Sequence, residues 1–212
     1  MIYPDDFIDK VICGDCLEVM KDIPDNSVDL VLTDPPYNYK QDFGVCKDSW
    51  TQEEYELFLN DIIKQCHCIT KKEIVMFCGT GNLYRYPEPS MIMMWYKPNA
   101  SHRAGRVIHN KFEPILVYSA QHNIFCDVIT CMAKTKNLVH PTEKPISIIS
   151  KLLNDFTKPN DIVLDPFLGS GTTAVACKQL NRHFIGIEIN PDYCKIAKER
   201  LMGVPDSLFK EV

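Results

Sequence analysis

The sequence predicts an α/β protein with a doubly wound mixed sheet, formed by a single domain of 212 residues. Short runs with strand character alternate with helical patterns along most of the chain, which is typical of a sheet covered by helices on both faces. Several of these runs are continuously apolar, as expected for central parallel strands. We find no internal repeat, linker or low-complexity segment, and the length is sufficient for one substantial core.

Seven runs are predicted to be strands because they are short and rich in apolar residues. They are Lys10–Cys13, Val28–Thr33, Glu73–Cys78, Met91–Tyr96, Glu113–Ser119, Asp161–Asp165 and His183–Glu188. Four other segments have the apolar spacing of helices. They are Thr51–Ile69, Pro145–Phe156, Gly171–Leu180 and Pro191–Leu201. The first of these opens with Thr51-Gln52-Glu53-Glu54, the arrangement of a capping box.

The composition, 45% hydrophobic and 24% charged, is that of an ordinary globular protein. The acidic N-terminus is followed by no apolar run, and no apolar stretch is long enough to span a bilayer, so we expect a cytoplasmic protein of a bacterium or a phage-infected host. Most of the ten cysteines lie in apolar runs and are expected to be free thiols. Cys13-x-x-Cys16 and Cys66-His67-Cys68 have metal-like spacing but lack a matching second pair, so we expect no metal.

Charge is distributed unevenly along the chain. The formal net charge is −5, which by itself argues weakly against binding to nucleic acid. Residues 1–60, however, carry −10, residues 61–160 carry +6, and residues 161–212 carry −1. The middle of the chain is therefore a candidate surface for a polyanion, although a solvated surface of mixed charge is the alternative.

Two segments in this basic region have little regular pattern, 98–111 and 119–140. The first contains Arg103, Arg106 and Lys111, and the second contains Lys134 and Lys136. Long irregular segments in a compact domain are often functional, with ordinary surface loops as the alternative.

The strongest local signal is a strand, a glycine turn and a helix over residues 161–176. The strand ends at Asp165, and Gly169 and Gly171 allow a tight turn and close approach of a ligand. The next strand ends in Glu188, which is suited to accept hydrogen bonds from two ribose hydroxyls. The spacing does not match the dinucleotide motif G-x-G-x-x-G. Because Asp165 favours a cationic group, we expect a cofactor with an amino-acid tail rather than NAD.

A further carboxylate, Asp15, follows the first predicted strand in Cys13-Gly14-Asp15-Cys16. It can accept a hydrogen bond from an adenine amino group of the cofactor. As a lone feature it can equally be a helix N-cap.

The second strand runs directly into Asp34-Pro35-Pro36-Tyr37. The two prolines stiffen the turn and remove two amide donors. The Asp34 carboxylate and the Pro35 carbonyl can both accept hydrogen bonds from a planar aromatic amine. Such contacts would free the nitrogen lone pair for attack on an electrophilic methyl group, while Tyr37 stacks on the base. A proline-rich structural turn is the alternative.

These motifs resemble the β-class DNA amino-methyltransferases, which act on adenine N6 or cytosine N4. Asp34-Pro35-Pro36-Tyr37 resembles the catalytic motif, and Asp165-Pro-Phe-Leu-Gly-Ser-Gly-Thr-Thr173 resembles the cofactor loop. Glu188, Gly14-Asp15 and His140-Pro-Thr-Glu-Lys144-Pro145 resemble the ribose-binding acid, the adenine-contacting position and the segment over the methionine end of the cofactor. The catalytic motif precedes the cofactor loop, which marks the β order.

The resemblance implies the seven-stranded, Rossmann-like methyltransferase sheet in circularly permuted order, S-adenosylmethionine as cofactor and a flipped DNA base as substrate. It implies a catalytic half at 1–96, a short target-recognition region at 97–139 and a cofactor-binding half at 140–212. The implied catalytic residues are Asp34, Pro35, Pro36 and Tyr37. The implied cofactor contacts are Asp15, Cys16, Asp34, His140, Thr142, Lys144, Asp165, Phe167, Gly169, Ser170, Gly171, Thr172, Thr173 and Glu188. The implied DNA contacts are Asn38, Lys97, Arg103, Arg106, Lys111, Lys134 and Lys136.

Aspartate at position 34 favours adenine N6, since serine there leans toward cytosine N4 in this family. Cytosine N4 is the alternative, followed by a non-catalytic DNA-binding relative and by an RNA or protein-amide methyltransferase. The short recognition region leaves few side chains for base readout, so we expect a homodimer.

Overall fold

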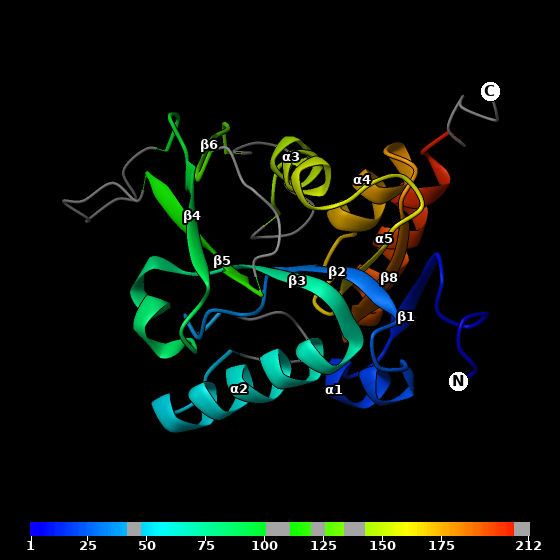
Figure 1. Ribbon diagram of the computed structural model, residues 1–212, viewed down its shortest axis with the longest axis horizontal. Helices are drawn as coiled ribbons and strands as arrows, with labels where there is room; N and C mark the ends of the chain where they lie inside the picture. Colours follow the sequence, from blue (N-terminus) through cyan, green and yellow to red (C-terminus); the bar gives the residue numbers. More distant parts are fainter. Residues whose placement is uncertain (42–47, 101–110, 120–125, 134–142, 206–212) are drawn as a thin grey trace.

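A mixed sheet of eight strands is the centre of the computed structural model, which describes residues 1–41, 48–100, 111–119, 126–133 and 143–205 (Figure 1). The strands are β1 Lys10–Cys13, β2 Val28–Thr33, β3 Thr70–Phe77, β4 Met91–Tyr96, β5 Phe112–Tyr118, β6 Val128–Thr130, β7 Ile162–Asp165 and β8 His183–Glu188. They lie side by side in the order β1-β8-β7-β2-β3-β5-β4-β6. The last two strands of the sequence are therefore inserted between the first two, which agrees with the permuted order that the resemblance implies.

The predicted count of seven strands is wrong by one, because the sequence analysis missed β6. This strand has three residues and lies in the segment that shows little periodicity. It pairs in parallel with β4 at the edge of the sheet, where Val128 is opposite Met94 and Thr130 is opposite Tyr96. Three residues are too few to show an alternating pattern, so only the pairing reveals the strand.

Within the described part of the sheet, only β5 runs opposite to the other strands. Strands β1, β8, β7, β2 and β3 form successive parallel pairs, whereas β5 is antiparallel to both β3 and β4. The N-terminal end of β5 therefore lies at the same edge as the carboxyl ends of the parallel strands. This reversal brings residue 113 to the edge where residues 34 and 165 lie.

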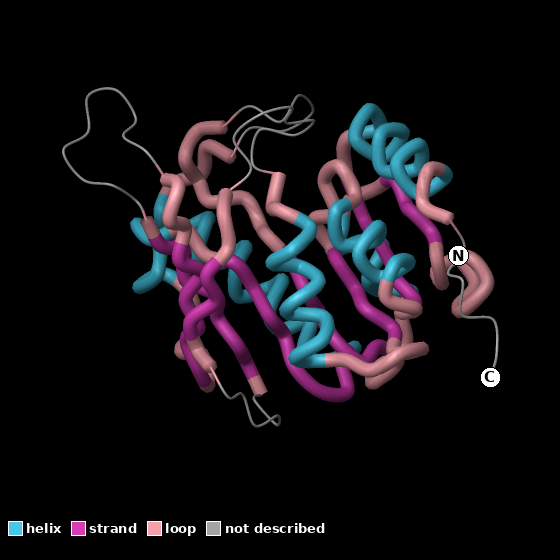
Figure 2. Tube along the Cα trace, turned by 90° about the horizontal axis from the view of Figure 1, so that it is seen from above, coloured by secondary structure: helices cyan, strands magenta, loops and turns pink. Residues whose placement is uncertain are grey.

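Helices cover both faces of the sheet (Figures 1 and 2). On one face lie α1 Cys16–Val19 and α2 Gln52–Ile69, and on the other lie α3 Ile146–Phe156, α4 Thr172–Gln179 and α5 Pro191–Met202. Alternate residues of the central strands enter the two cores. Leu32 packs in the core with α3 and α4, whereas Val31 packs in the core with α2. Burial on both faces explains why these strands are continuously apolar.

The predicted helices are confirmed to within one or two residues. The capping box of α2 is present, since the Thr51 side chain accepts from the Glu54 amide at 3.2 Å and the Glu54 carboxylate accepts from the Thr51 amide at 2.8 Å. Asn190 caps α5 by accepting from the Asp192 amide at 2.9 Å. Among the helices of the described chain, the sequence analysis missed only short ones: α1 and the 3₁₀ turns η1 Met20–Asp22 and η2 Thr80–Arg85.

The order of the strands explains where the predicted site lies. The carboxyl ends of β1, β8, β7 and β2 are neighbours at one edge of the sheet. They lead to Asp15, Glu188, Asp165 and Asp34, respectively. Ligands of doubly wound sheets bind at this edge, outside the carboxyl ends of the strands.

Candidate active site

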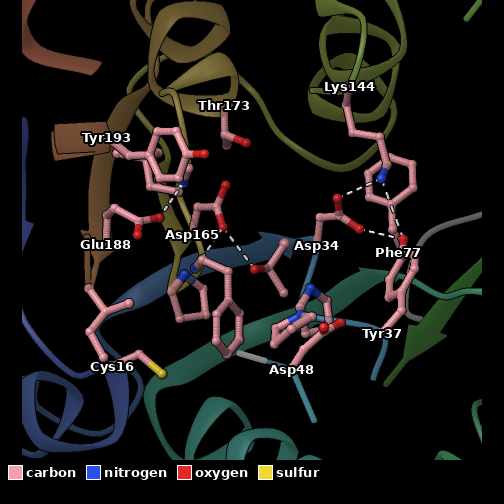
Figure 3. A pocket seen from close by; sticks show the side chains of 18 of the residues that line it. Cys16, Asp34, Tyr37, Asp48, Phe77, Lys144, Asp165, Thr173, Glu188 and Tyr193 are labelled. Atoms are coloured by element: carbon pink, nitrogen blue, oxygen red, sulfur yellow. Dashed lines mark hydrogen bonds and ion pairs between the residues drawn. The ribbon is translucent and has the colours of Figure 1, made fainter. Parts of the chain in front are cut away.

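A cavity of about 490 Å³ opens at this edge of the sheet and contains both predicted half-sites (Figure 3). Glu188 and Asp165 lie in one part of the cavity, and Asp34 lies nearer to Lys144 and Tyr37. The volume is in the range of small-molecule sites. One space can therefore hold a cofactor and the reacting group of a second substrate.

The Asp34 loop, residues 34–37, is held in place by α2 and by the segment after β3. The Tyr55 hydroxyl donates to the Pro36 carbonyl at 2.9 Å, and the Asn82 side-chain amide donates to the Tyr37 carbonyl. Tyr55 is fully buried and hydrogen-bonded to Tyr86 at 3.3 Å. These contacts fix the backbone of the proline turn at the end of β2, so that Asp34 points into the cavity.

Both carboxylate oxygens of Asp34 accept hydrogen bonds from protein groups. Oδ1 accepts from the Tyr37 hydroxyl, and Oδ2 accepts from the Lys144 ammonium at 2.5 Å. Lys144 Nζ also lies 3.0 Å from Glu113 Oε1, and the Tyr37 hydroxyl donates to the same oxygen at 2.9 Å. Lys97 pairs with Glu113 Oε2 at 3.1 Å. Two carboxylates and two ammonium groups thus form a charge-balanced cluster, which we call the Asp34 cluster: Asp34, Tyr37, Lys97, Glu113 and Lys144.

Burial and charge act in opposite directions on the groups of the Asp34 cluster. Burial raises the pKa of Asp34, and Lys144 opposes that rise. Burial also acts to raise the pKa of Glu113, but Lys144 and Lys97 outweigh it, so that this pKa is lowered. Burial acts to lower the pKa of Lys144, and the two carboxylates outweigh it. Lys144 is therefore protonated at neutral pH, and Tyr37, whose pKa burial raises well above its usual value, is a neutral donor.

At the cofactor end, Asp165 is buried and hydrogen-bonded at the end of β7. Its Oδ1 accepts from the Thr33 hydroxyl at 2.8 Å and from the Phe167 amide at 3.1 Å. Burial nevertheless raises the pKa of Asp165 to about 6, against the opposing hydrogen bonds from Thr173 and Thr33. A carboxylate in this setting is stabilised by an approaching cation, which fits the ammonium group of an amino-acid tail.

The glycine turn requires both of its glycines. Gly169 and Gly171 have φ angles of 55° and 87°, in the region that favours glycine. A Cβ on Gly171 would lie 2.8 Å from the Cβ of Ala197, so that this glycine also allows α4 to approach α5 closely. The Gly169 amide donates to Glu188 Oε2 at 2.8 Å, and the Asn190 amide donates to Oε1 at 2.8 Å. These amides orient the Glu188 carboxylate in the cavity.

Ser170 and Thr172 of the same turn contact Arg200 of α5. Arg200 donates to the Ser170 carbonyl at 2.7 Å, to its hydroxyl at 2.8 Å and to the Thr172 hydroxyl at 3.4 Å. Its other terminal nitrogen pairs with Glu143 at 3.2 Å. Arg200 therefore joins Ser170 and Thr172, two of the expected cofactor contacts, to Glu143 in the segment before α3.

Asp15 is the N-cap of α1. Its Oδ1 accepts from the amides of Leu17 at 2.9 Å and Glu18 at 3.2 Å. The residue is exposed and also lines the cavity, so the capping role and the predicted cofactor role are compatible. Cys16 is buried beside it, and burial followed by the Asp15 charge raises the pKa of its thiol to about 12. Cys16 is thus a neutral wall of the cavity.

The structure places three predicted DNA contacts outside the cavity lining. Asn38 exchanges two hydrogen bonds with the backbone of Trp50, at 2.9 and 3.0 Å. The Lys97 ammonium, expected to bind phosphate, instead pairs with Glu113, and its side chain is only 14% exposed. Lys111 is half-buried at the entry to β5. The remaining predicted DNA contacts, Arg103, Arg106, Lys134 and Lys136, lie outside the described residues, as do the predicted cofactor contacts His140 and Thr142.

Sequence reasoning missed several residues of the site. Thr33 donates to Asp165, and Glu113 pairs with Lys144, the partner of Asp34. Asp48 lines the cavity with only 1% of its surface exposed. Asp48 Oδ2 accepts from the Tyr39 amide at 2.9 Å, while Oδ1 has no partner among the described residues. The lone acid in the apolar run Phe112–Tyr118 was the available signal for Glu113. No comparable pattern marked Asp48.

A family model described as DNA methylase matches residues 28–128 and 128–199, which include the Asp34 loop, the glycine turn and Glu188. The chain belongs to the DNA methylase family. M.BglII of Bacillus subtilis, a type II methyltransferase, is 30% identical over 96% of this chain and 72% of its own length. The DNA adenine methyltransferase YhdJ of Escherichia coli (strain K12) is 30% identical over 90% of this chain and 82% of its own.

Solved structures of DNA methyltransferases share the fold. The complex of M1.HpyAVI with S-adenosylmethionine aligns with a TM-score of 0.70 and 26% identity, covering 91% of this chain and 98% of the other. The cytosine-N4-specific PvuII methyltransferase aligns with a TM-score of 0.72 and covers 90% of this chain and 85% of the other; at 18% identity it supports the fold alone. The predicted methyltransferase fold is confirmed, and so, at the level of the family, are methyl transfer and its cofactor S-adenosylmethionine.

Two further observations are restricted to the residues that the structure describes. Their helices are too short or too polar to cross a membrane. Their His, Cys, Asp and Glu side chains form no group of three or more that could hold a metal ion.

Proposed function

We propose that this DNA methylase transfers a methyl group to the N6 amino group of adenine in DNA. The observation that carries the proposal is the position of Asp34 in the same cavity as Asp165 and Glu188. Asp34 supplies an acceptor for an aromatic amine, and the other two carboxylates match the cationic and hydroxyl groups of one cofactor molecule. The reacting amine and a methyl donor can therefore meet in a single space.

The residues at the cofactor end fit S-adenosylmethionine. Asp165 is a buried acid with a raised pKa, Glu188 is a carboxylate held by two amides, and Gly169 lines the cavity, whereas Gly171 packs against α5. When bound, S-adenosylmethionine supplies an electrophilic methyl group. We propose that Asp165 binds its ammonium, Glu188 its ribose hydroxyls and Asp15 its adenine amino group.

At the other end of the cavity, Asp34 and the Pro35 carbonyl would accept the two N–H bonds of the target amine. Such acceptors favour a tetrahedral nitrogen with an available lone pair. The nitrogen gains the methyl group and loses one proton, for which the Asp34 carboxylate is the nearest base. Tyr37 lies beside Asp34 and can stack on a base that has left the helix.

The choice of adenine rests on two supports. Asp34 stands at the position where serine leans toward cytosine N4, and the similar YhdJ of E. coli is named a DNA adenine methyltransferase. Cytosine N4 is the alternative chemistry, because the same pair of acceptors fits either exocyclic amine.

We propose the three-part division stated above, with the DNA surface in residues 97–139, a homodimer as the active form and the cytoplasm as the compartment. Lys97 is excluded from the proposed phosphate contacts because Glu113 engages its ammonium. Arg103, Arg106, Lys111, Lys134 and Lys136 keep the proposed role, and they supply the positive charge of the middle segment.

The test is expression in a host that lacks DNA methylation, followed by nucleoside analysis of its DNA. N6-methyladenine is expected for the wild type, and Asp34→Ala should abolish it while cofactor binding persists. N4-methylcytosine without N6-methyladenine would overturn the adenine assignment. Methyl transfer that survives in Asp34→Ala would overturn the role of Asp34. Modification calls on the same DNA would give the recognition sequence.

A further inference from the structure

Glu113 reaches the catalytic edge of the sheet because β5 is antiparallel to its neighbours. It is the second residue of β5, and its side chain is only 13% exposed. The rest of the strand, from Pro114 to Tyr118, is buried and apolar apart from the Tyr118 hydroxyl. A carboxylate in this position requires partners, since an unpaired buried charge is strongly destabilising.

Two of the partners of Glu113, Lys144 and Tyr37, are also the hydrogen-bond donors to Asp34. Lys144 Nζ lies between the two acids, 2.5 Å from Asp34 Oδ2 and 3.0 Å from Glu113 Oε1. The Tyr37 hydroxyl likewise lies between Asp34 Oδ1 and Glu113 Oε1. Each donor therefore already contacts both carboxylates.

This arrangement conflicts with the proposed reaction as long as it persists. A target amine needs Asp34 as an acceptor, yet both Asp34 oxygens accept from Lys144 and Tyr37. Each donor takes one acceptor position on Asp34 and draws on its negative charge, so a shift of both donors toward Glu113 would leave Asp34 the stronger acceptor for the amine. A protonated lysine left without a carboxylate partner beside the Phe77 ring, whose centroid lies 4.9 Å from Nζ, would be strongly destabilised.

We infer that Glu113 is a positioning residue that takes over the Lys144 ammonium and the Tyr37 hydroxyl when the target amine engages Asp34. The inference rests on the proposed function of the site. The exchange moves hydrogen bonds alone: Lys144 keeps its proton, Tyr37 keeps its proton, and Glu113 stays ionised with Lys97 on its other oxygen. Asp34, relieved of the ammonium, becomes the stronger base and can take the proton that the methylated nitrogen releases.

Other ionisable groups also act on Asp34 and bear on any pH profile. Asp165 at the end of β7 interacts with it electrostatically, as do Cys78 after β3 and Tyr86 after η2. These groups stay the same in the variants below. Differences between variants therefore report on Glu113 and Lys144.

The central variant is Glu113→Gln, which keeps the shape and removes the charge. We expect single-turnover methyl transfer at the pH plateau to fall by about tenfold or more, because the ammonium stays on Asp34. S-adenosylmethionine binding should remain within about twofold of the wild type, since Glu113 does not line the cavity near Glu188. The rate should fall at acidic pH where Asp34 becomes protonated, which we call the acidic limb. Because Glu113 raises the pKa of Asp34, its neutralisation should move this limb to lower pH.

Lys144→Met should move the acidic limb in the opposite direction, because Lys144 lowers the pKa of Asp34. The double variant Glu113→Gln/Lys144→Met should be faster at its plateau than Glu113→Gln alone, since no ammonium then has to be relocated. A purely structural role would instead lower the stability of the variants without moving the acidic limb of the rate, because contacting residues are coupled in stability in any case. Circular dichroism and cofactor binding establish that each variant is folded.

Glu88→Gln is the matched control, because Glu88 is exposed in the segment before β4 and carries the same charge. Its rate and pH profile should equal those of the wild type. A Glu113→Gln plateau within about twofold of the wild type, or a double variant slower than both single variants, would overturn the inference. A wild type that methylates no DNA would overturn the proposed function instead, and that result is visible before any variant is made.

Discussion

The Thr33 hydroxyl donates a 2.8 Å hydrogen bond to Oδ1 of Asp165 across 132 positions of sequence. Thr33 is the last residue of β2, and Asp165 is the last residue of β7, its parallel neighbour. The residue after Thr33 is Asp34, so this bond, together with the pairing of β2 and β7, holds the proposed acceptor for the amine near the proposed anchor for the cofactor. Both groups of the bond are buried.

Thr33→Val should weaken this link without changing the size of the side chain. Loss of the donor leaves a buried carboxylate oxygen with the Phe167 amide as its protein donor, which costs about 1–3 kcal/mol. We expect a lower free energy of unfolding in urea and a higher pKa of Asp165. Thr33→Ser keeps the hydroxyl and is the control, and equal stability of the two variants would contradict the role of the bond.

Gly171→Ala should destabilise the protein more than any ordinary Gly-to-Ala change on a helix. The left-handed φ of 87° alone costs about 1–2 kcal/mol for a residue with a Cβ, and the added atom would lie 2.8 Å from Ala197. Gly203→Ala is the matched control at the end of α5, since Gly203 has a φ of −77° and its Cβ would lie 3.5 Å from the nearest atom. Similar decreases in Tm for the two variants would show that position 171 does not require glycine.

Stability should decrease between about pH 4 and pH 6 through Asp165. An ordinary aspartate has a pKa near 4, whereas burial raises that of Asp165 to about 6, so the folded state holds this proton more tightly. Its contribution is therefore complete below about pH 4 and is lost as the pH rises to about 6, by about 3 kcal/mol at most. Urea unfolding across this range should show a larger loss in the wild type than in Asp165→Asn, in which the raised pKa values of Asp34 and Glu188 persist.

The raised pKa of Asp165 also predicts that the stabilisation of the protein by bound cofactor depends on pH. A bound ammonium compensates the ionised form of Asp165 only, so the thermal shift produced by S-adenosylmethionine should grow as the pH rises through about 6. In Asp165→Asn the shift should be smaller and nearly independent of pH. A wild-type shift that is the same at pH 5 and pH 7.5 would show that no cation binds there.

Neutralising Arg103, Arg106 and Lys111 should weaken DNA binding and flatten its dependence on salt. Each phosphate contact that is lost reduces the slope of log K against log salt by about 0.9. Lys195→Gln on α5 is the control for each single neutralisation, since it removes one positive charge from an exposed residue outside residues 97–139. An unchanged slope in the triple variant would move the DNA surface elsewhere.

Sedimentation at assay concentrations tests the proposed homodimer separately. A dimer is expected because the recognition region is short for base readout by one chain. Monomers alone at those concentrations would remove that argument.

The residues that sequence reasoning brought together are those at the ends of parallel strands. Asp34, Asp165 and Glu188 could be placed at one edge because parallel strands end on the same side of a sheet. Glu113 begins a strand, and its approach to the site depends on the reversed direction of β5, which no local pattern reveals. The ion pairs of its partners were missed for the same reason. Lys144, expected to contact the cofactor, lines the cavity and pairs with Asp34, whereas Lys97, expected on phosphate, pairs with Glu113.

The insertion of β7 and β8 between β1 and β2 has a consequence for synthesis on the ribosome. The first two strands emerge early, but the positions that join them are filled only by strands translated near the end of the chain. A product interrupted before β7 contains Asp34 yet lacks the neighbouring strand, Asp165 and Glu188. Such a product therefore holds the proposed acceptor for the amine without the residues proposed to bind the methyl donor, so we expect it to be inactive.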